Sequence, residues 1–212
     1  MILKKIVPFL LCIPLSVSVF AQDSKDNPGV RFGLKGGLSI ASIIKTNDPN
    51  FHSDLLFGFN GGAVLQIPFG HVIAIQPEVL FSQKGYHATG DFLGSPYDYR
   101  RYLNFLDIPL LLRINATNNF GIVIGPQFSW LLSQHTNFKS GLNSYEQTVN
   151  NDNEDIRKNI LGGVVGVDIN LDRNVFIYAR YTLDFQNDNG NGSPSTPAYK
   201  NQVFQLGLGI LF

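Results

Sequence analysis

Charged residues stand at alternating positions in several segments that are otherwise apolar or rich in glycine. Successive side chains of a β-strand point to opposite faces, and these charges all fall on the face that also carries the small residues. Buried charges need partners of opposite sign, so the pattern predicts an internal ion network. The residues concerned are Lys35, Glu78, Lys84, Asp107, Arg113, Asp168, Arg180 and Asp184.

Six of these residues are the candidate site: Lys35, Glu78, Asp107, Arg113, Asp168 and Arg180. The expected strand register puts Glu78 opposite Asp107 and Arg180 diagonal to Asp168. Two interpretations are open. The favoured one is a structural network that fills the interior of a barrel, and the alternative is a path for protons or ions, or a ligand site.

Catalytic chemistry has one candidate. Ser133 and His135, with Glu146 as the acid, contain the residue types of a nucleophile–base–acid trio, which would make the chain an outer-membrane lipid hydrolase. The sequence has no Gly-x-Ser-x-Gly, His-Glu-x-x-His or phosphate-loop motif. We therefore expect no enzymatic activity, no catalytic residue and no cofactor.

Metal binding has weak support in the sequence. The run Asn150–Asp155 offers oxygen ligands for calcium, but it lacks the ligand-and-glycine spacing of a calcium loop. The single cysteine, Cys12, lies in an N-terminal apolar run, so no cysteine site or disulfide is expected in the folded domain. We predict no metal centre.

The elements that must hold these residues are long strands. Alternation predicts eight of them, each about eleven to fourteen residues, which is enough to cross a membrane at the usual tilt. The last one ends on Phe212, and a terminal phenylalanine commonly serves as the insertion signal of outer-membrane barrels. The predicted strands are Arg31–Ser42, Leu56–Ile67, Val72–Lys84, Arg101–Ile114, Phe120–Ser133, Asn159–Leu171, Val175–Gln186 and Asn201–Phe212.

Short and long connections alternate along the chain. The short ones are Pro68–His71, Asn115–Asn119 and Asp172–Asn174, and the long ones are Ile43–Leu55, Gly85–Arg100, Gln134–Lys158 and Asn187–Lys200. Outer-membrane barrels have short periplasmic turns and long outer loops. The sequence therefore predicts an all-β, eight-stranded, antiparallel up-and-down transmembrane barrel with both termini in the periplasm.

The apolar face of these strands identifies the solvent. A soluble, lipocalin-like barrel would turn this face inward, but the opposite face is rich in glycine and suits a narrow, packed lumen. We therefore expect the apolar face to contact outer-membrane lipid between two aromatic girdles. The lower girdle contains Phe32, Phe120 and Phe212, and the upper one contains Phe57, Phe59, Phe81, Tyr102, Phe128, Trp130, Tyr181, Phe185 and Phe204.

The N-terminus carries an export signal. Lys4 and Lys5 precede an apolar run that ends in Val19-Phe20-Ala21, which predicts cleavage before Gln22. Charged residues make up 15% of the chain, against about 25% in soluble domains, and the formal net charge of zero gives no reason to expect nucleic-acid binding. The predicted organisation is a signal peptide at 1–21, a flexible periplasmic segment at 22–30 and a barrel domain at 31–212.

Five stretches resemble the PorT-like outer-membrane β-barrel proteins of Bacteroidetes. They are Gly33–Leu38, Ile75–Gly85 (IQPEVLFSQKG), Leu103–Leu112 (LNFLDIPLLL), Gly125–Phe128 (GPQF) and Val203–Gly209 (VFQLGLG). The resemblance covers essentially the whole chain after the signal peptide. It implies the fold and the location. It implies only weakly a role in type IX secretion, with which the founding member is associated, since most relatives have no assigned role.

The sequence thus predicts a non-enzymatic outer-membrane protein with a structural or accessory role in the cell envelope. Its expected partners are outer-membrane lipid, the barrel-assembly machinery during insertion, and an unidentified envelope or secretion component. The first alternative is a narrow barrel that transports or binds a ligand in its lumen, and the second is the hydrolase that would use Ser133 and His135.

Overall fold

The computed structural model describes residues 29–45, 54–92, 95–140, 144–149, 157–187 and 198–212. The predicted signal peptide, residues 1–21, and most of the predicted periplasmic segment lie outside these ranges. No helix in the described part of the chain has the length and apolar character needed to cross a membrane.

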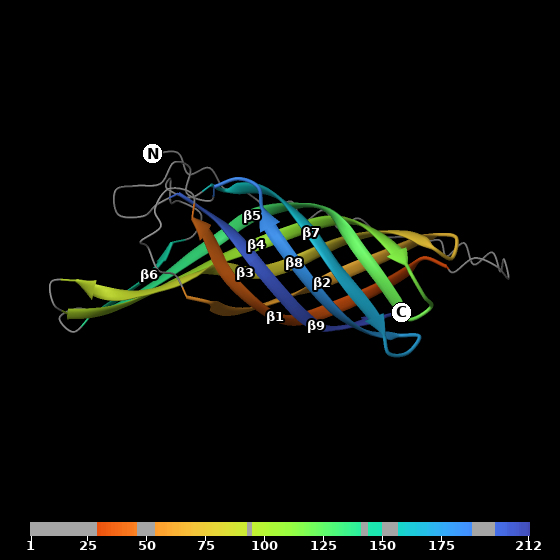
Figure 1. The fold of residues 1–212 in the computed structure, drawn as a ribbon, viewed down its shortest axis with the longest axis horizontal. Coiled ribbons are helices and arrows are strands. Elements are labelled where there is room, and N and C mark those ends of the chain that lie inside the picture. Colours follow the sequence, from red (N-terminus) through yellow and green to blue (C-terminus); the bar gives the residue numbers. More distant parts are fainter. Residues whose placement is uncertain (1–28, 46–53, 93–94, 141–143, 150–156, 188–197) are drawn as a thin grey trace, which may run out of the picture.

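Eight antiparallel strands form a closed ring (Figure 1). The ring closes because the first strand pairs with the last, from Gly33↔Leu211 to Lys45↔Tyr199. This confirms the predicted all-β fold and its eight-stranded ring. In order around the ring, the strands are β1 (Arg31–Lys45), β2 (Leu56–Phe69), β3 (Ile73–Phe92), β4 (Ser95–Asn115), β5 (Phe120–Ser140), β7 (Asn159–Asn170), β8 (Val175–Asp184) and β9 (Tyr199–Leu211).

Three strands, β3, β4 and β5, are each seven residues longer than predicted, and two of the expected long loops are largely β-structure in their described parts. β3 and β4 run on to a hairpin that pairs as far as Phe92↔Ser95, β5 reaches Ser140, and a short ninth strand, β6 (Ser144–Val149), pairs with β5 alone among the described strands. These segments include β-branched and aromatic residues such as Tyr86 and Thr136, which favour strands. We call these projecting segments of β3, β4, β5 and β6, residues 85–92, 95–100, 134–140 and 144–149, the extension (Figure 1).

The extension begins where β3 leaves β2. Their continuous pairing ends at Asn60↔Ser82, and above it an isolated bridge, Asp54↔His87, joins β3 to the preceding segment. Gly85, with φ of 130°, lies at this point. A Cβ atom at Gly85 would collide with the carbonyl oxygen of Arg101, so only glycine allows β3 to bend here against β4.

The outer face of the ring is an apolar belt of exposed side chains such as Leu34, Ile124, Val165 and Leu208. Aromatic residues of the expected girdles lie on it, and Phe81 is partly buried where its ring stacks on Phe59 at 5.3 Å. Phe120 and Tyr102 are partly buried as well, and Tyr102 packs against a cluster of Ala41, Leu56 and Val203. The exposed girdle members are Phe32, Phe57, Phe59, Phe128, Trp130, Tyr181, Phe185, Phe204 and Phe212.

A charged side chain introduced at mid-height of the apolar belt tests whether the belt contacts lipid or water. Val165→Arg should lower the free energy of unfolding in lipid vesicles by about 2–4 kcal/mol, because arginine is costly at the bilayer midplane. Leu171→Arg, beside the short turn between β7 and β8, is the matched control and should cost at most about 1 kcal/mol. Equal effects in a denaturant titration would contradict a lipid-facing belt.

Candidate functional site

Five charged side chains form a chain of ion pairs across the lower lumen, towards the short turns. Lys35 Nζ lies 2.5 Å from Glu78 Oε2, and Arg180 Nη2 lies 3.9 Å from Glu78 Oε1. Arg180 Nη2 also lies 2.6 Å from Asp168 Oδ1, and Arg113 Nη1 lies 2.7 Å from Asp168 Oδ2. These residues come from five different strands, so the lower cluster ties together distant parts of the ring.

A second cluster lies higher in the lumen and centres on Lys84. Its Nζ lies 3.2 Å from Asp184 Oδ1 and 3.5 Å from Asp107 Oδ1, and it donates a hydrogen bond of 3.0 Å to Ser129 Oγ. The ammonium group also sits 4.7 Å from the centre of the Phe105 ring, a cation–π distance. One lysine therefore serves two buried carboxylates in this upper cluster.

The eight predicted lumen charges balance, with four cations and four carboxylates. They are Lys35, Lys84, Arg113 and Arg180, and Glu78, Asp107, Asp168 and Asp184, and all are buried. Neutral groups complete the lower cluster: Gln76 Nε2 donates to Glu78 Oε1 at 2.7 Å, and Gln66 Nε2 donates to Gln76 Oε1 at 3.1 Å. A buried network of this kind fixes side chains in place, because each lost partner would leave a desolvated charge.

Rings fill the space between the charges. Tyr178 donates a hydrogen bond of 2.6 Å to Asn60 Oδ1, and Lys35 Nζ lies 4.5 Å from the centre of the Tyr178 ring. Beneath it, Phe176 is fully buried and occupies the room left by Gly209, where an added Cβ would collide with the ring. The glycines of the lumen face thus make room for side chains from across a narrow barrel.

The structure corrects one predicted contact. Asp107 pairs with Leu80 and not with Glu78, whereas Arg180 does lie diagonal to Asp168. The prediction was wrong because the register of β3 against β4 is set by the hairpin of the extension, which the sequence analysis treated as a loop. Glu78 instead lies beside Lys35, and Asp107 lies beside Lys84.

Sequence reasoning missed one lumen cation. Arg101 is buried on β4, above Asp107 on the same strand, beside the hydroxyl of Tyr86. A signal for it was present, since Arg101 has the same strand parity as Asp107 and Arg113. It was overlooked because the predicted strand was taken to begin at this residue.

The hydrolase candidate is affected by a bulge in β5. The register against β4 moves from Phe105↔Leu131 to Asn104↔Ser133, so β5 contains one extra residue there. The bulge reverses the faces of the strand above it. Ser133 and His135 therefore lie on the outer face.

Ser133 belongs to a row of neutral polar side chains on that outer face. Gln83 Nε2 donates to Asn104 Oδ1 at 3.0 Å, and Asn104 Nδ2 donates to Ser133 Oγ at 2.9 Å. His135 packs its ring near Tyr102, with ring centres 6.5 Å apart. We call Gln83, Asn104 and Ser133 the outer polar row. The side chain of Glu146 lies outside the described part of the structure, so the trio has no observed catalytic geometry.

Metal binding finds no support in the described residues, where no group of three or more His, Cys, Asp or Glu side chains could hold an ion. The calcium candidate at Asn150–Asp155 lies outside the described residues.

The sequence matches a family model described as "Outer membrane protein beta-barrel domain" over residues 20–187. The chain belongs to this family. The finer likeness to PorT-like proteins remains a prediction. No curated protein that was compared with the chain matches it.

Solved structures with a similar fold include two small outer-membrane barrels. Ail, the attachment invasion locus protein of Yersinia pestis, is 14% identical with a TM-score of 0.50, and the match covers 87% of this chain and 100% of Ail. Neisserial surface protein A is 13% identical with a TM-score of 0.50, and the match again covers 87% and 100%. At this identity the likeness concerns the fold, and it agrees with an outer-membrane barrel.

Removing one member of a lumen ion pair should destabilise the barrel more than removing both. Glu78→Gln leaves Lys35 buried without its carboxylate and should lower the free energy of unfolding by about 3–5 kcal/mol. Adding Lys35→Met should restore a large part of that loss in a double-mutant cycle. Asp98→Asn, in an exposed pair with Arg100, is the control and should cost at most about 1 kcal/mol. Additive losses from the two lumen substitutions would contradict the pairing.

Proposed function

We propose that this chain is a non-enzymatic structural or accessory protein of the outer membrane that acts through its surfaces and not through its lumen. The observation that supports this function is an interior filled by paired charges and packed side chains. Every one of the eight predicted lumen charges has an oppositely charged neighbour within 4.0 Å. Eight-stranded barrels have an interior just wide enough for side chains, so the network leaves no open aqueous channel.

The proposed orientation puts both termini in the periplasm. The short turns all lie at one end of the ring, and the C-terminus lies there too (Figure 1). Phe212 N donates to Phe32 O at 2.7 Å, which brings the beginning and the end of the barrel together at this end. Short periplasmic turns are the rule for such barrels, so the extension projects outside the cell in this orientation.

The extension is the surface that we propose for a partner. His87 Nε2 of β3 lies 3.0 Å from Asp98 Oδ2 of β4 and so joins the two strands above the barrel, while Arg100 Nε, also on β4, lies 3.1 Å from Asp98 Oδ1. Burial disfavours the carboxylate slightly, but hydrogen bonds from His87 and Arg100 prevail and hold the pKa of Asp98 below its ordinary value. An ordered projection of this kind can present a fixed surface to another protein.

The partner's identity is a further part of the proposal. We infer an envelope component, and the link to type IX secretion is supported only by the resemblance to PorT-like proteins. Outer-membrane lipid around the belt and the barrel-assembly machinery at Phe212 are the other proposed partners. The hydrolase alternative gains nothing from the structure, since Ser133 Oγ accepts a hydrogen bond from Asn104 on the outer face.

A planar-bilayer recording tests the closed lumen. The wild-type barrel should show no steady conductance, because the lower cluster fills its cross-section. Replacing both Asp168 and Arg180 by alanine removes the centre of that cluster without changing its net charge, and it should produce discrete current steps. A steady ohmic current through the wild-type barrel would favour the transport alternative instead.

Affinity capture from the native envelope tests the role of the extension. Replacing residues 87–100 with an Asn-Gly turn shortens the β3–β4 hairpin at the pair His87↔Arg100 and should abolish recovery of the partner. A matched variant with altered residues 116–119, in the short turn at the opposite end, should still recover it. Equal recovery by both variants, or no specific partner for the wild type, would count against the proposal.

A further inference from the structure

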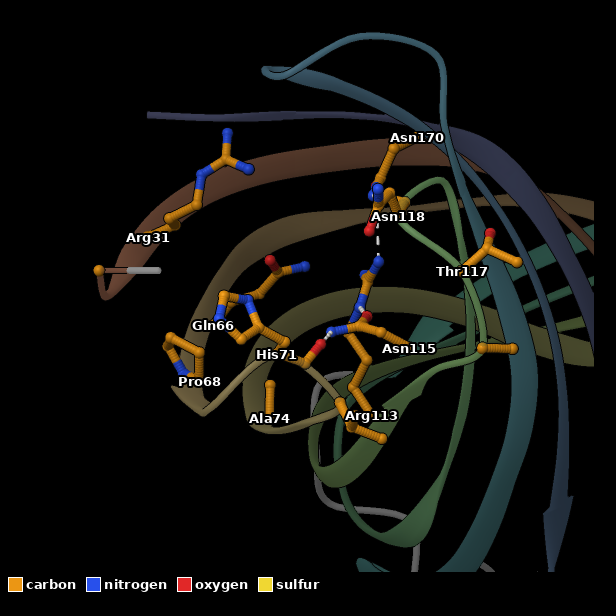
Figure 2. A pocket seen from close by; sticks show the side chains of 13 residues that line it. Arg31, Gln66, Pro68, His71, Ala74, Arg113, Asn115, Thr117, Asn118 and Asn170 are labelled. Carbon is orange, nitrogen blue, oxygen red and sulfur yellow. Dashed lines mark hydrogen bonds between the residues drawn. The ribbon is translucent and has the colours of Figure 1, made fainter. Parts of the chain in front are cut away.

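The end of the barrel with the short turns contains a cavity of about 390 Å³ (Figure 2). It is lined by the start of β1, the β2–β3 and β4–β5 turns and the ends of the adjoining strands. Pockets of about 300–1,000 Å³ are the usual size for small ligands. We call this cavity the mouth.

The charges that line the mouth are all basic. Arg31 and Arg113 contribute guanidinium groups and His71 contributes an imidazole, and none of the described residues that line the cavity is Asp or Glu. The carboxylate of Asp168 lies deeper, where it pairs with Arg113. The mouth therefore favours a negatively charged ligand.

The two arginines differ in how far their charges are already neutralised. Arg113 pairs with Asp168, and its Nε donates to Asn115 Oδ1 at 2.8 Å. Arg31 donates to a neutral group, the backbone carbonyl of Arg173, and pairs with no carboxylate in the described part of the chain. One guanidinium charge at the rim thus lacks a counter-charge.

Neighbouring contacts hold the mouth in shape before any ligand arrives. Asn115 Nδ2 donates to the carbonyl oxygen of His71 at 3.2 Å, which joins the β2–β3 and β4–β5 turns. Asn170 Nδ2 donates to the carbonyl oxygen of Asn118 at 3.2 Å, which joins the end of β7 to the β4–β5 turn (Figure 2). A preformed site binds with a smaller ordering cost.

We propose that the mouth binds the carboxylate of a small ligand, with Arg31 as the anion-binding group and Arg113 as a fixed basic floor. The planar fork of a guanidinium matches the two oxygens of a carboxylate. A carboxylate also carries one negative charge, which matches the single uncompensated guanidinium, whereas a phosphate monoester carries about 1.5–2. The chemistry of this site is independent of the proposed role of the extension.

Calorimetric titration of the full barrel in detergent at low salt tests the site. The probes are N-acetyl-alanyl-alanine, its C-terminal amide and inorganic phosphate. The free acid should bind at least tenfold more tightly than the amide or phosphate. Arg31→Gln should weaken binding of the acid at least tenfold, and Arg31→Lys, which keeps the charge without the fork, should weaken it less. Arg157→Gln, at the opposite end of the barrel, should change nothing.

The chain itself could supply the carboxylate. Asp23 and Asp26 lie within six residues of Gly29, which lines the mouth. If these residues occupy the site, N-acetyl-alanyl-alanine will bind the double variant Asp23→Asn, Asp26→Asn more tightly than the wild type. Adding Arg31→Gln to that variant will abolish the gain in affinity. Binding of phosphate but not of the acid, equal binding of acid and amide, or no binding by either protein would overturn the proposal.

Discussion

The structure depends on one constraint, which is that an apolar solvent offers no hydrogen-bond partner to the backbone. In hydrocarbon each unpaired N–H or C=O group costs several kcal/mol, so a sheet there must have no free edge. The pairing of β1 with β9 meets this demand by joining the two ends of the chain. The apolar belt follows from the same constraint, since the face turned to lipid must lack charge.

A closed ring of eight strands then creates a second problem, because charges buried in its narrow interior need partners. The chain solves it with pairs of opposite charges, held by Gln66 and Gln76 and packed against aromatic rings. The lower cluster joins five strands through side chains alone. Ion pairs of this kind fix the arrangement of side chains in the lumen and also fill it. The two ends of the barrel are therefore the surfaces left for function.

Much of this arrangement could be predicted because alternation has a period of two in a strand. That period assigned Lys35, Glu78 and Arg180 to the lumen, where the structure has them buried. Register could not be predicted in the same way. A short turn fixes the pairing of its strands, but the β3–β4 connection was long, so the partner of Asp107 was misplaced. Likewise, nothing in the local sequence marks the bulge that moves Ser133 to the outer face.

The mouth could not be predicted from the sequence, for a different reason. Its lining residues come from turns and strand ends scattered between Gly29 and Asn170, and only the closed ring brings them together. The alternating pattern identified Arg113 as a lumen residue but contained no information on the neutral partners around it. Arg31 was seen only as the first residue of a strand.

The outer polar row also has a consequence for the vertical position of the protein in the bilayer. Amide and hydroxyl groups on the outward side belong at the level of the lipid head groups, so Asn104 marks where the hydrocarbon ends. From Asn115, beside the short turn, β4 reaches Asn104 in eleven residues. At about 3.3 Å per residue and a tilt of about 45°, that length spans roughly 25 Å, which is the thickness of the apolar band of such barrels. The row thus anchors the barrel at a fixed depth and leaves the extension in water.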